Sequence, residues 1–137
     1  MKVQIVTTGE EHIEGYEKVE IDDGNIDLAK YSDNECSFIL ASECLDTMGY
    51  DEVKSFLLEA RQKMRLGSSL VVGGTDIRLF ARAIISGAIS TENANRILSQ
   101  KKSCADVNYV SNILEDVGLS VVSTMVAGIH YEIEASR

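Results

Sequence analysis

The first turn of the chain combines one glycine with hydroxyl and carboxylate side chains. The turn Thr7-Thr8-Gly9-Glu10 follows an apolar run, Val3-Gln4-Ile5-Val6, and a second strand-like run ends at Glu20 and Ile21. In α/β proteins the first such turn is a frequent place for a nucleotide cofactor, because glycine lets the backbone approach the ligand. The first chemistry to consider is therefore cofactor binding by a turn that carries a single early glycine.

The residues that commonly bind metals are few and widely spaced. The three cysteines are Cys36, Cys44 and Cys104, with no C-x-x-C pair, and the two histidines are His12 and His130. This spacing predicts no metal site and favours buried, reduced thiols.

Length and composition fit one globular domain over residues 1–137, with 45% hydrophobic and 26% charged residues. The net charge of -9 makes this an acidic protein that repels phosphate backbones, so we expect no nucleic-acid partner, whereas a small nucleotide or a cationic ligand remains compatible. The sequence contains no run long enough for a membrane span and no apolar leader, so we expect no membrane partner and a cytoplasmic location.

Hydrophobic periodicity predicts the elements that must position the turn. Buried strands are expected at 3–6, 18–21, 36–41 and 70–72, with a very short strand at 26–28 and a stop at Gly73-Gly74. Helices are expected at 51–65, 76–86, 91–98 and 103–117. The expected helix caps are Asp76, Ser90 and Ser103, the last as a capping box with Asp106, and Gly67 is expected to end the first helix.

Two final strands, at 119–126 and 129–135, flank Ala127-Gly128 and must be antiparallel because the turn between them is tight. The alternation of strands and helices before them predicts parallel strands. The expected fold class is α/β, a single doubly wound and mostly parallel sheet that ends in an antiparallel C-terminal hairpin.

This order of elements resembles the class I S-adenosylmethionine-dependent methyltransferases. It is similar in particular to short predicted methyltransferases whose sequences run L-H-L-G-C-G-x-x-x-x-P-G-Y-I-N-I-D. Thr7-Thr8-Gly9 stands at the G-C-G, Glu14-Gly15-Tyr16 at the P-G-Y and Glu20 at the closing acidic residue. Further along, residues 33–42 resemble D-N-S-V-D-x-I-Y-A-S, residues 64–70 resemble L-K-P-G-G-K-L, and residues 74–77 resemble V-P-D-L.

The resemblance implies a Rossmann-like fold with S-adenosylmethionine at the carboxyl ends of the strands. Glu20, or Asp22 in a shifted register, would accept the ribose hydroxyls, and Asp27, Leu28 and the chain after Ser42 would bind the adenine. The implied cofactor-binding residues are Thr7, Thr8, Gly9, Glu20, Asp27, Leu28 and Ser42. No catalytic residue is assigned. Glu43 and Asp46 are a candidate pair, although helix-start carboxylates are favoured by the helix dipole alone.

The glycine motif is degenerate, because Thr7 replaces its first glycine and the histidines of the family's H-V-L-E-H are absent from Glu43-Cys44-Leu45-Asp46-Thr47. Two functions therefore stay open. One is methyl transfer from S-adenosylmethionine to a small molecule or glycan precursor. The other is a non-catalytic methyltransferase-like domain that binds a ligand or partner. The expected partners are a small-molecule ligand and either a second copy or another chain that covers the open cofactor side.

Overall fold

The structure is a computed structural model in which residues 1–7 and 9–137 are described. The predicted site residue Thr8 lies outside the described residues. One six-stranded sheet runs through the molecule in the order β2-β1-β3-β4-β6-β5. The strands are β1 Lys2–Val6, β2 Glu17–Glu20, β3 Cys36–Ala41, β4 Met64–Thr75, β5 Ser120–Ala127 and β6 His130–Ser136. The first four strands pair in parallel, whereas β6 is antiparallel to both β4 and β5. The predicted α/β class and the antiparallel C-terminal hairpin are confirmed.

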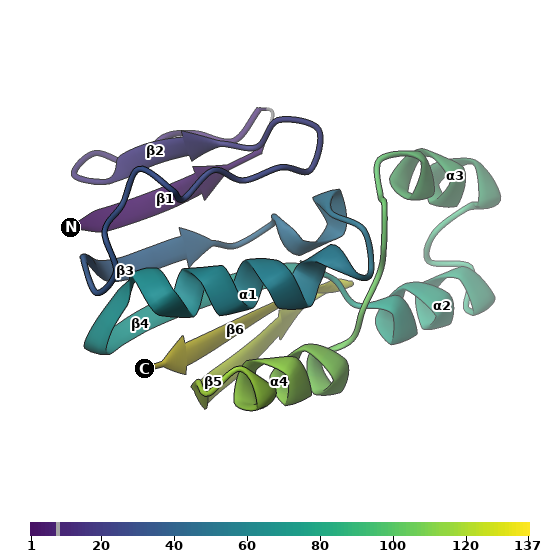
Figure 1. Ribbon diagram of the computed structural model, residues 1–137. Helices are drawn as coiled ribbons and strands as arrows, with labels where there is room; N and C mark the ends of the chain where they lie inside the picture. The colour runs from purple at the N-terminus through teal and green to yellow at the C-terminus, as the bar shows by residue number, and fades with distance from the viewer. Residues whose placement is uncertain (8) are drawn as a thin grey trace.

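Two helices cover one face of this sheet and two others lie beyond its carboxyl edge (Figure 1). The helical segments are the short η1 Leu45–Thr47, α1 Glu52–Lys63, α2 Ile77–Ile85, α3 Thr91–Ser99 and α4 Val107–Asp116. α1 and α4 lie against the sheet, and Leu57, Ala60 and Leu114 from these helices are fully buried in the core. Burial of these apolar side chains holds the two helices on the sheet. Each large side chain that is fully buried stabilises the fold by roughly 1.5–3 kcal/mol.

The predicted caps of α2 and α3 are confirmed, and the predicted cap of α4 is wrong. The Asp76 carboxylate accepts hydrogen bonds from the N–H groups of Arg78 and Leu79, at 2.9 and 3.1 Å. Ser90 accepts from Asn93 N–H at the start of α3. The cap of α4 is Asp106, three residues later than the expected Ser103, because the Ser103 hydroxyl instead donates to the Met48 carbonyl.

One strand and two element boundaries were predicted wrongly from the sequence. Residues 26–28 form no strand, since Asp22 and Asn25 close a tight bridge and Leu28 turns into the core with no exposed surface. α1 ends at Lys63 and not at Arg65, and Gly67 lies inside β4 at a φ of 80°. Gly73 and Gly74 do not stop β4, which continues to Thr75.

The connection from β1 to β2 spans residues 7–16, and its described residues, 7 and 9–16, form no helix. Gln4, which is 1% exposed, holds this connection. Its amide nitrogen donates to the Glu11 carbonyl at 2.9 Å, and its amide oxygen accepts from Ile13 N–H at 2.8 Å. Val3 and Ile5 belong to the core beneath α1 and α4, so the alternation along β1 places Gln4 on the opposite face. The connection therefore packs against the face that α1 and α4 leave open.

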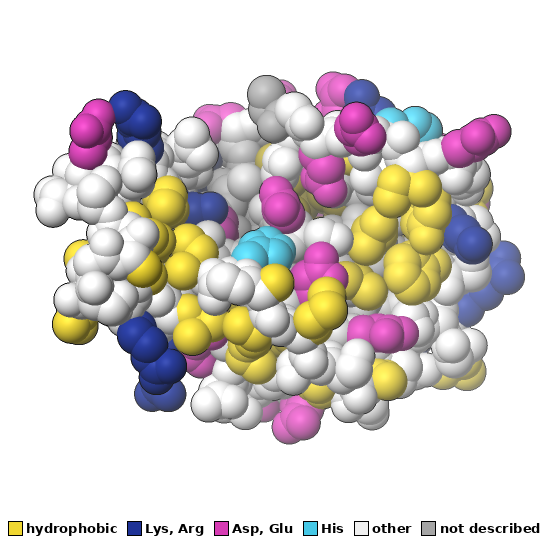
Figure 2. Space-filling model, turned by 180° about the vertical axis from the view of Figure 1, so that it is seen from behind, with side chains coloured by type: hydrophobic (Ala, Val, Ile, Leu, Met, Phe, Trp, Pro, Cys, Tyr) yellow, Lys and Arg dark blue, Asp and Glu magenta, His cyan; other side chains and the backbone are white. Residues whose placement is uncertain are grey.

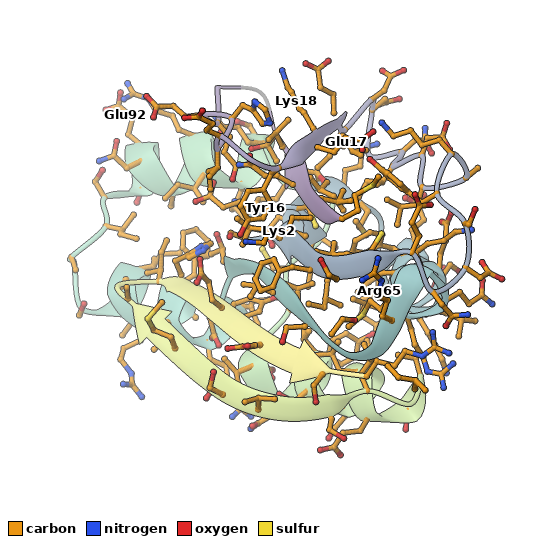
Figure 3. The ribbon with its side chains drawn as sticks, turned by 90° about the vertical axis from the view of Figure 1, so that its left-hand side faces the viewer. Lys2, Tyr16, Glu17, Lys18, Arg65 and Glu92 are labelled. Atoms are coloured by element: carbon orange, nitrogen blue, oxygen red, sulfur yellow. The ribbon has the colours of Figure 1, made fainter. Side chains whose placement is uncertain are left out.

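An aromatic contact fixes the far end of the same connection. The Tyr16 ring meets the Phe38 ring edge-on, with centroids 6.1 Å apart, and the Lys2 ammonium lies 5.7 Å from the Tyr16 centroid. Figure 3 shows Lys2 and Tyr16 side by side on this face of the sheet. Viewed from behind, the face carries hydrophobic side chains interspersed with acidic ones (Figure 2).

We predict that Gln4→Met lowers the free energy of unfolding by about 1–3 kcal/mol, because it leaves a backbone N–H and a carbonyl of the connection without their partner. Urea unfolding followed by circular dichroism measures the change. Gln62→Met is the matched control, since Gln62 is exposed on α1. Equal stabilities of the two variants would contradict the role assigned to Gln4.

Candidate functional site

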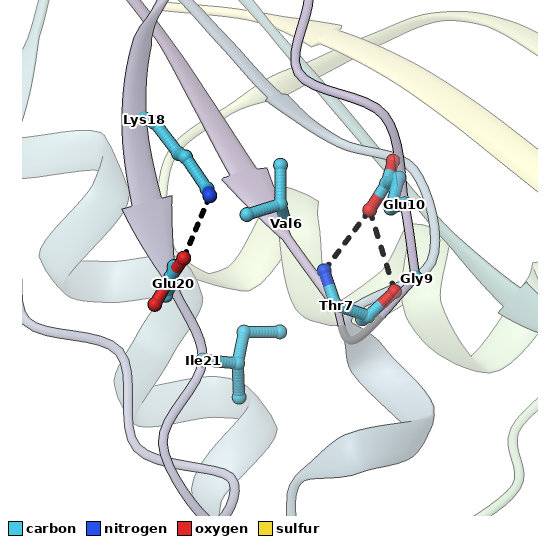
Figure 4. A pocket seen from close by; sticks show the side chains of 7 residues that line it. All are labelled: Val6, Thr7, Gly9, Glu10, Lys18, Glu20 and Ile21. Carbon is cyan, nitrogen blue, oxygen red and sulfur yellow. Dashed lines mark hydrogen bonds and ion pairs between the residues drawn. The ribbon is translucent and has the colours of Figure 1, made fainter.

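A cavity of about 330 Å³ lies at the carboxyl ends of β1 and β2 (Figure 4). We call it the β1–β2 cavity. Its lining residues are Val6, Thr7, Gly9, Glu10, Lys18, Glu20 and Ile21. Three of the predicted cofactor residues, Thr7, Gly9 and Glu20, are thus brought together from two adjacent parallel strands. The register that pairs Val6 with Glu20 is what places Glu20 beside the turn.

The turn that closes the cavity is held by hydrogen bonds to the carboxylate of Glu10, which belongs to the turn itself. Glu10 N–H donates to the Thr7 carbonyl at 3.1 Å, and in return the Glu10 carboxylate accepts from Thr7 N–H at 3.1 Å and lies 3.4 Å from the Thr7 hydroxyl. Gly9 has a φ of 87°, a conformation that glycine adopts without steric cost. A Cβ added at Gly9 would meet no protein atom within 4 Å. The space next to Gly9 is therefore open to a ligand.

An ion pair crosses the other wall of the cavity. The Lys18 ammonium lies 2.6 Å from the Glu20 carboxylate, and both side chains are solvent-accessible. The hydrogen bond from Lys18 lowers the pKa of the Glu20 carboxyl below its ordinary value. Glu20 is therefore ionised at neutral pH. Together with Glu10, it gives the cavity two carboxylates against one ammonium, a balance that favours a ligand bearing positive charge.

The remaining predicted cofactor residues lie elsewhere. The Asp27 carboxylate accepts from Ala29 N–H at 2.9 Å, an Asx turn within its own loop, and Leu28 is buried in the core. Ser42 follows β3, and a Cβ on Gly73 would clash with its carbonyl oxygen. These three residues do not line the β1–β2 cavity. The register-shifted alternative, Asp22, is engaged in its bridge with Asn25.

A second hollow adjoins the first at Thr7. It has a volume of about 480 Å³ and is lined by Thr7, Glu43, Asp46, Thr47, Gln100 and Lys101. A neighbouring space of about 300 Å³ shares Glu43, Asp46, Gln100 and Lys101 with it and extends to Thr75 and His130. We call these two spaces together the Asp46 cavity. Thr7 thus stands between a cavity at the first strand pair and one at the ends of β3 and β4.

Asp46 organises this second cavity. Its carboxylate accepts from Thr75 N–H at 2.8 Å and pairs with the Lys101 ammonium at 2.8 Å, while its carbonyl accepts from Lys102 N–H at 2.9 Å. The side chain is only 6% exposed, so burial makes both partners necessary. These bonds join η1, the end of β4 and the segment that returns from α3.

Gly74 permits this arrangement, a role that the sequence did not reveal. A Cβ at Gly74 would lie 2.5 Å from Asp46 Oδ1, closer than packed atoms approach. Glycine at position 74 thus allows Asp46 to lie close to β4. The sequence had instead predicted that Gly73-Gly74 ends the strand. A glycine pair followed by an acidic helix cap gives no signal of this in the sequence, because the carboxylate that fills the space comes from a residue almost thirty positions earlier.

Other candidate residues have local partners. His12 Nε2 lies 2.7 Å from the Tyr16 carbonyl oxygen within the β1–β2 connection. Tyr50 is exposed and stacks on Tyr109, with centroids 5.3 Å apart. Cys36 and Cys44 are buried and Cys104 is partly exposed, and burial raises the pKa of the Cys44 thiol above its ordinary value. In residues 1–7 and 9–137, His, Cys, Asp and Glu side chains form no group of three or more that could hold a metal ion.

Of the helices in the described part of the chain, none combines the length and apolar character needed to cross a membrane.

Comparison with known proteins identifies the fold. No protein-family model matches the chain, and no curated protein matches its sequence. Among solved structures, an S-adenosylmethionine-dependent methyltransferase from Archaeoglobus fulgidus superposes with a TM-score of 0.63 at 12% identity, over 90% of this chain and 68% of that chain. A Thermotoga maritima methyltransferase, described as a possible histamine N-methyltransferase, gives 0.60 at 16% identity, over 89% of this chain and 64% of its own.

A third similar structure was solved with a ligand bound. The Burkholderia thailandensis 1,6-didemethyltoxoflavin-N1-methyltransferase, with bound 1,6-didemethyltoxoflavin and S-adenosylhomocysteine, gives a TM-score of 0.58 at 13% identity, over 89% of this chain and 51% of its own. The chain therefore spans between 51% and 68% of the length of these three proteins. It has the class I S-adenosylmethionine-dependent methyltransferase fold, as the resemblance in sequence implied.

We predict that Lys101→Met lowers the free energy of unfolding by about 3 kcal/mol, because it leaves the buried Asp46 carboxylate without its ammonium partner. The neighbouring Lys102 pairs with Asp23, whose side chain is 87% exposed, so Lys102→Met should cost less than about 1 kcal/mol. Urea denaturation of both variants decides the point. A similar loss in the two would show that the Asp46–Lys101 pair does not hold the second cavity together.

Proposed function

We propose that this chain binds S-adenosylmethionine in the β1–β2 cavity and transfers its methyl group to a small polar molecule or a glycan precursor in the Asp46 cavity. The main support is that Thr7, Gly9 and Glu20 meet around one cavity at the carboxyl ends of β1 and β2. In open α/β sheets, ligands bind outside the carboxyl ends of the strands. The similar structures of this fold are S-adenosylmethionine-dependent enzymes.

The charge of the cavity suits this cofactor. S-adenosylmethionine carries a sulfonium and an ammonium against one carboxylate, so it is a net cation, and it supplies the activated methyl group. Glu20 would accept hydrogen bonds from the ribose hydroxyls, and Glu10 would face the positive end of the ligand. The open space at Gly9 would admit the ligand beside the backbone. Asp27, Leu28 and Ser42 remain predictions for the adenine end.

The Asp46 cavity supports a polar acceptor. Its lining offers carboxylate, amide, ammonium and imidazole groups from Glu43, Gln100, Lys101 and His130, a set that suits hydroxyl-rich molecules. Asp46 is already committed to Thr75 and Lys101. Glu43, in contrast, is an exposed carboxylate and is the group available to receive a proton from an acceptor. Methyl transfer otherwise requires chiefly in-line positioning of donor and acceptor.

One observation favours the second candidate, a methyltransferase-like domain that binds a ligand without catalysis. The Glu10 carboxylate already satisfies Thr7 N–H, and Lys18 already occupies Glu20. The polar and charged groups that line the cavity thus already pair with one another in the absence of a ligand. Incubation of the purified protein with S-adenosylmethionine and candidate acceptors distinguishes the two: appearance of S-adenosylhomocysteine with methylated product supports catalysis, whereas binding without any turnover supports the second candidate.

Calorimetric titration with S-adenosylmethionine should show that Glu20→Gln weakens binding by about tenfold to about a hundredfold, because a hydrogen-bond acceptor loses its charge. Glu17→Gln is the control, since Glu17 lies on the same strand and pairs with Lys30. The lowered pKa of Glu20 further predicts that affinity is constant between about pH 5 and about pH 7 and falls only below 4.5, the ordinary value of a glutamate. Absence of heat from the unaltered protein at millimolar ligand would refute the proposal.

Gly9→Val should abolish S-adenosylmethionine binding, because the new side chain would enter the space assigned to the ligand. Gly15 has nearly the same backbone conformation, with a φ of 88°, and is equally free of neighbouring atoms. Gly15→Val therefore carries a similar backbone cost outside the β1–β2 cavity and should retain binding. If both variants fold and bind alike, the turn is not the cofactor site.

A further inference from the structure

A further space, of about 230 Å³, lies between α2, α3 and the segment that returns from them towards α4. Ile77 and Phe80 of α2 and Leu98 of α3 form its helical walls, and residues 101–104 complete the lining. We call it the α2–α3 pocket. Lys101 lines both this pocket and the Asp46 cavity, so the two spaces adjoin at that residue.

The apolar walls of the α2–α3 pocket do not belong to the core of the sheet. Ile77 and Leu98 are 45% and 49% exposed, and Phe80, although buried, is not among the residues of the core cluster beneath α1 and α4. Figure 2, in which α2 and α3 lie at the left, shows hydrophobic side chains gathered on this part of the molecule. Apolar side chains around a concave space are the usual lining of small-molecule sites.

The charged groups beside the pocket already have partners. The Lys101 ammonium pairs with the Asp46 carboxylate at 2.8 Å, and the Lys102 ammonium pairs with Asp23 at 3.1 Å. In the described part of the chain, the lining of the pocket includes no carboxylate. Burial, and then the nearby Asp46 carboxylate, raises the pKa of the Cys104 thiol, so this wall is uncharged at neutral pH. The pocket therefore suits an uncharged apolar group.

The lining changes from polar to apolar along the two adjoining spaces. Glu43 lies at the polar end of the Asp46 cavity, whereas Ile97 and Ile129 line the part of that cavity that also includes Lys101. A molecule that extends from Glu43 past Lys101 thus passes from carboxylate and amide groups to hydrocarbon.

The size of the α2–α3 pocket favours one kind of occupant. Sites for whole drug-sized ligands have volumes of roughly 300 Å³ or more, so a space of about 230 Å³ holds a substituent of a molecule bound next door. A helix or strand of another protein, about 10 Å across with its side chains, does not fit into it. The adjoining Asp46 cavity is the place where the rest of such a molecule would lie.

We infer that the acceptor is amphipathic: its hydroxyl-bearing part lies in the Asp46 cavity, and an uncharged alkyl or aromatic group attached to it lies in the α2–α3 pocket. A sugar or polyol with an apolar substituent has this form. The inference rests on the proposed function, because it names the class of acceptor for that site.

A pair of glucosides with the same sugar tests the inference. The ¹⁵N-labelled protein is titrated with octyl β-D-glucopyranoside, below the concentration at which it forms micelles, and with methyl β-D-glucopyranoside. We expect the octyl compound to shift the amides of Ile77, Leu98 and Cys104 and to bind at least about tenfold more tightly. Tenfold corresponds to about 1.4 kcal/mol, which is less than the burial of two methylene groups contributes. Unmoved amides, or equal binding of the two glucosides, would overturn the inference.

A matched pair of variants tests the position of the octyl group. Leu98→Asp should weaken octyl glucoside binding by at least about tenfold, because it places a carboxylate in the apolar wall. Ile85→Asp is the control and should bind normally, since Ile85 is an 87% exposed apolar residue of α2 that does not line the pocket. Equal affinities of the two variants would overturn the inference. If Leu98→Asp does not fold, as judged by circular dichroism, Ile77→Ser takes its place.

Calorimetry with S-adenosylmethionine separates failure of this inference from failure of the proposed function. Leu98 does not line the β1–β2 cavity, so Leu98→Asp should bind S-adenosylmethionine as the unaltered protein does. Heat with S-adenosylmethionine, but no preference for the octyl compound, overturns the inference alone. Absence of heat from the unaltered protein refutes the proposed function, and the acceptor assignment is overturned with it.

Discussion

The length of the β1–β2 connection is the constraint on which the rest of the molecule depends. Ten residues, 7–16, must return the chain from the end of β1 to the start of a parallel neighbour. A parallel crossover usually takes a dozen residues or more and contains a helix, so this connection crosses the sheet as an extended loop. Gln4 makes that possible, because its buried amide supplies the hydrogen bonds that hold the loop on the open face.

The short connection also determines the chemistry of the β1–β2 cavity. In many dinucleotide-binding folds a helix begins at this turn, and its N-terminus attracts anions. Here the turn is closed by the Glu10 carboxylate, and Glu20 faces it from β2. The cavity is consequently acidic and suits a cationic ligand. At the other end of the carboxyl edge, the buried Asp46–Lys101 pair and the close approach at Gly74 keep the second cavity in a defined shape.

Much of the framework could be predicted from the sequence because it follows from periodicity and local capping. The apolar stripe of α1, the caps Asp76 and Ser90, and the final hairpin all depend on residues within a few positions of each other. The grouping of Thr7, Gly9 and Glu20 was implied by the resemblance to the methyltransferases, and the structure brings these three residues together around one cavity. The helix stripe, the caps and the hairpin are encoded locally, and the structure confirms the expected strands and helices in their order, except for the strand expected at 26–28.

The features that escaped prediction depend on partners distant in sequence or on side-chain direction. Nothing near Gln4 indicates that a polar residue in an apolar strand binds the loop that follows. The apolar residue Leu28 was expected in a short strand, yet it packs into the core from an irregular segment. Ser103 has the spacing of a capping residue, but its hydroxyl reaches Met48, which lies 55 positions away. Gly74 is explained only by Asp46, which the fold brings against it.

Binding of S-adenosylmethionine in the β1–β2 cavity can be followed residue by residue in a nuclear magnetic resonance titration of the ¹⁵N-labelled protein with that compound. We expect saturable shifts of the Thr7, Gly9 and Glu20 amides. A titration to millimolar ligand that leaves those three amides unmoved, or that shifts only residues elsewhere in the sheet, would contradict it.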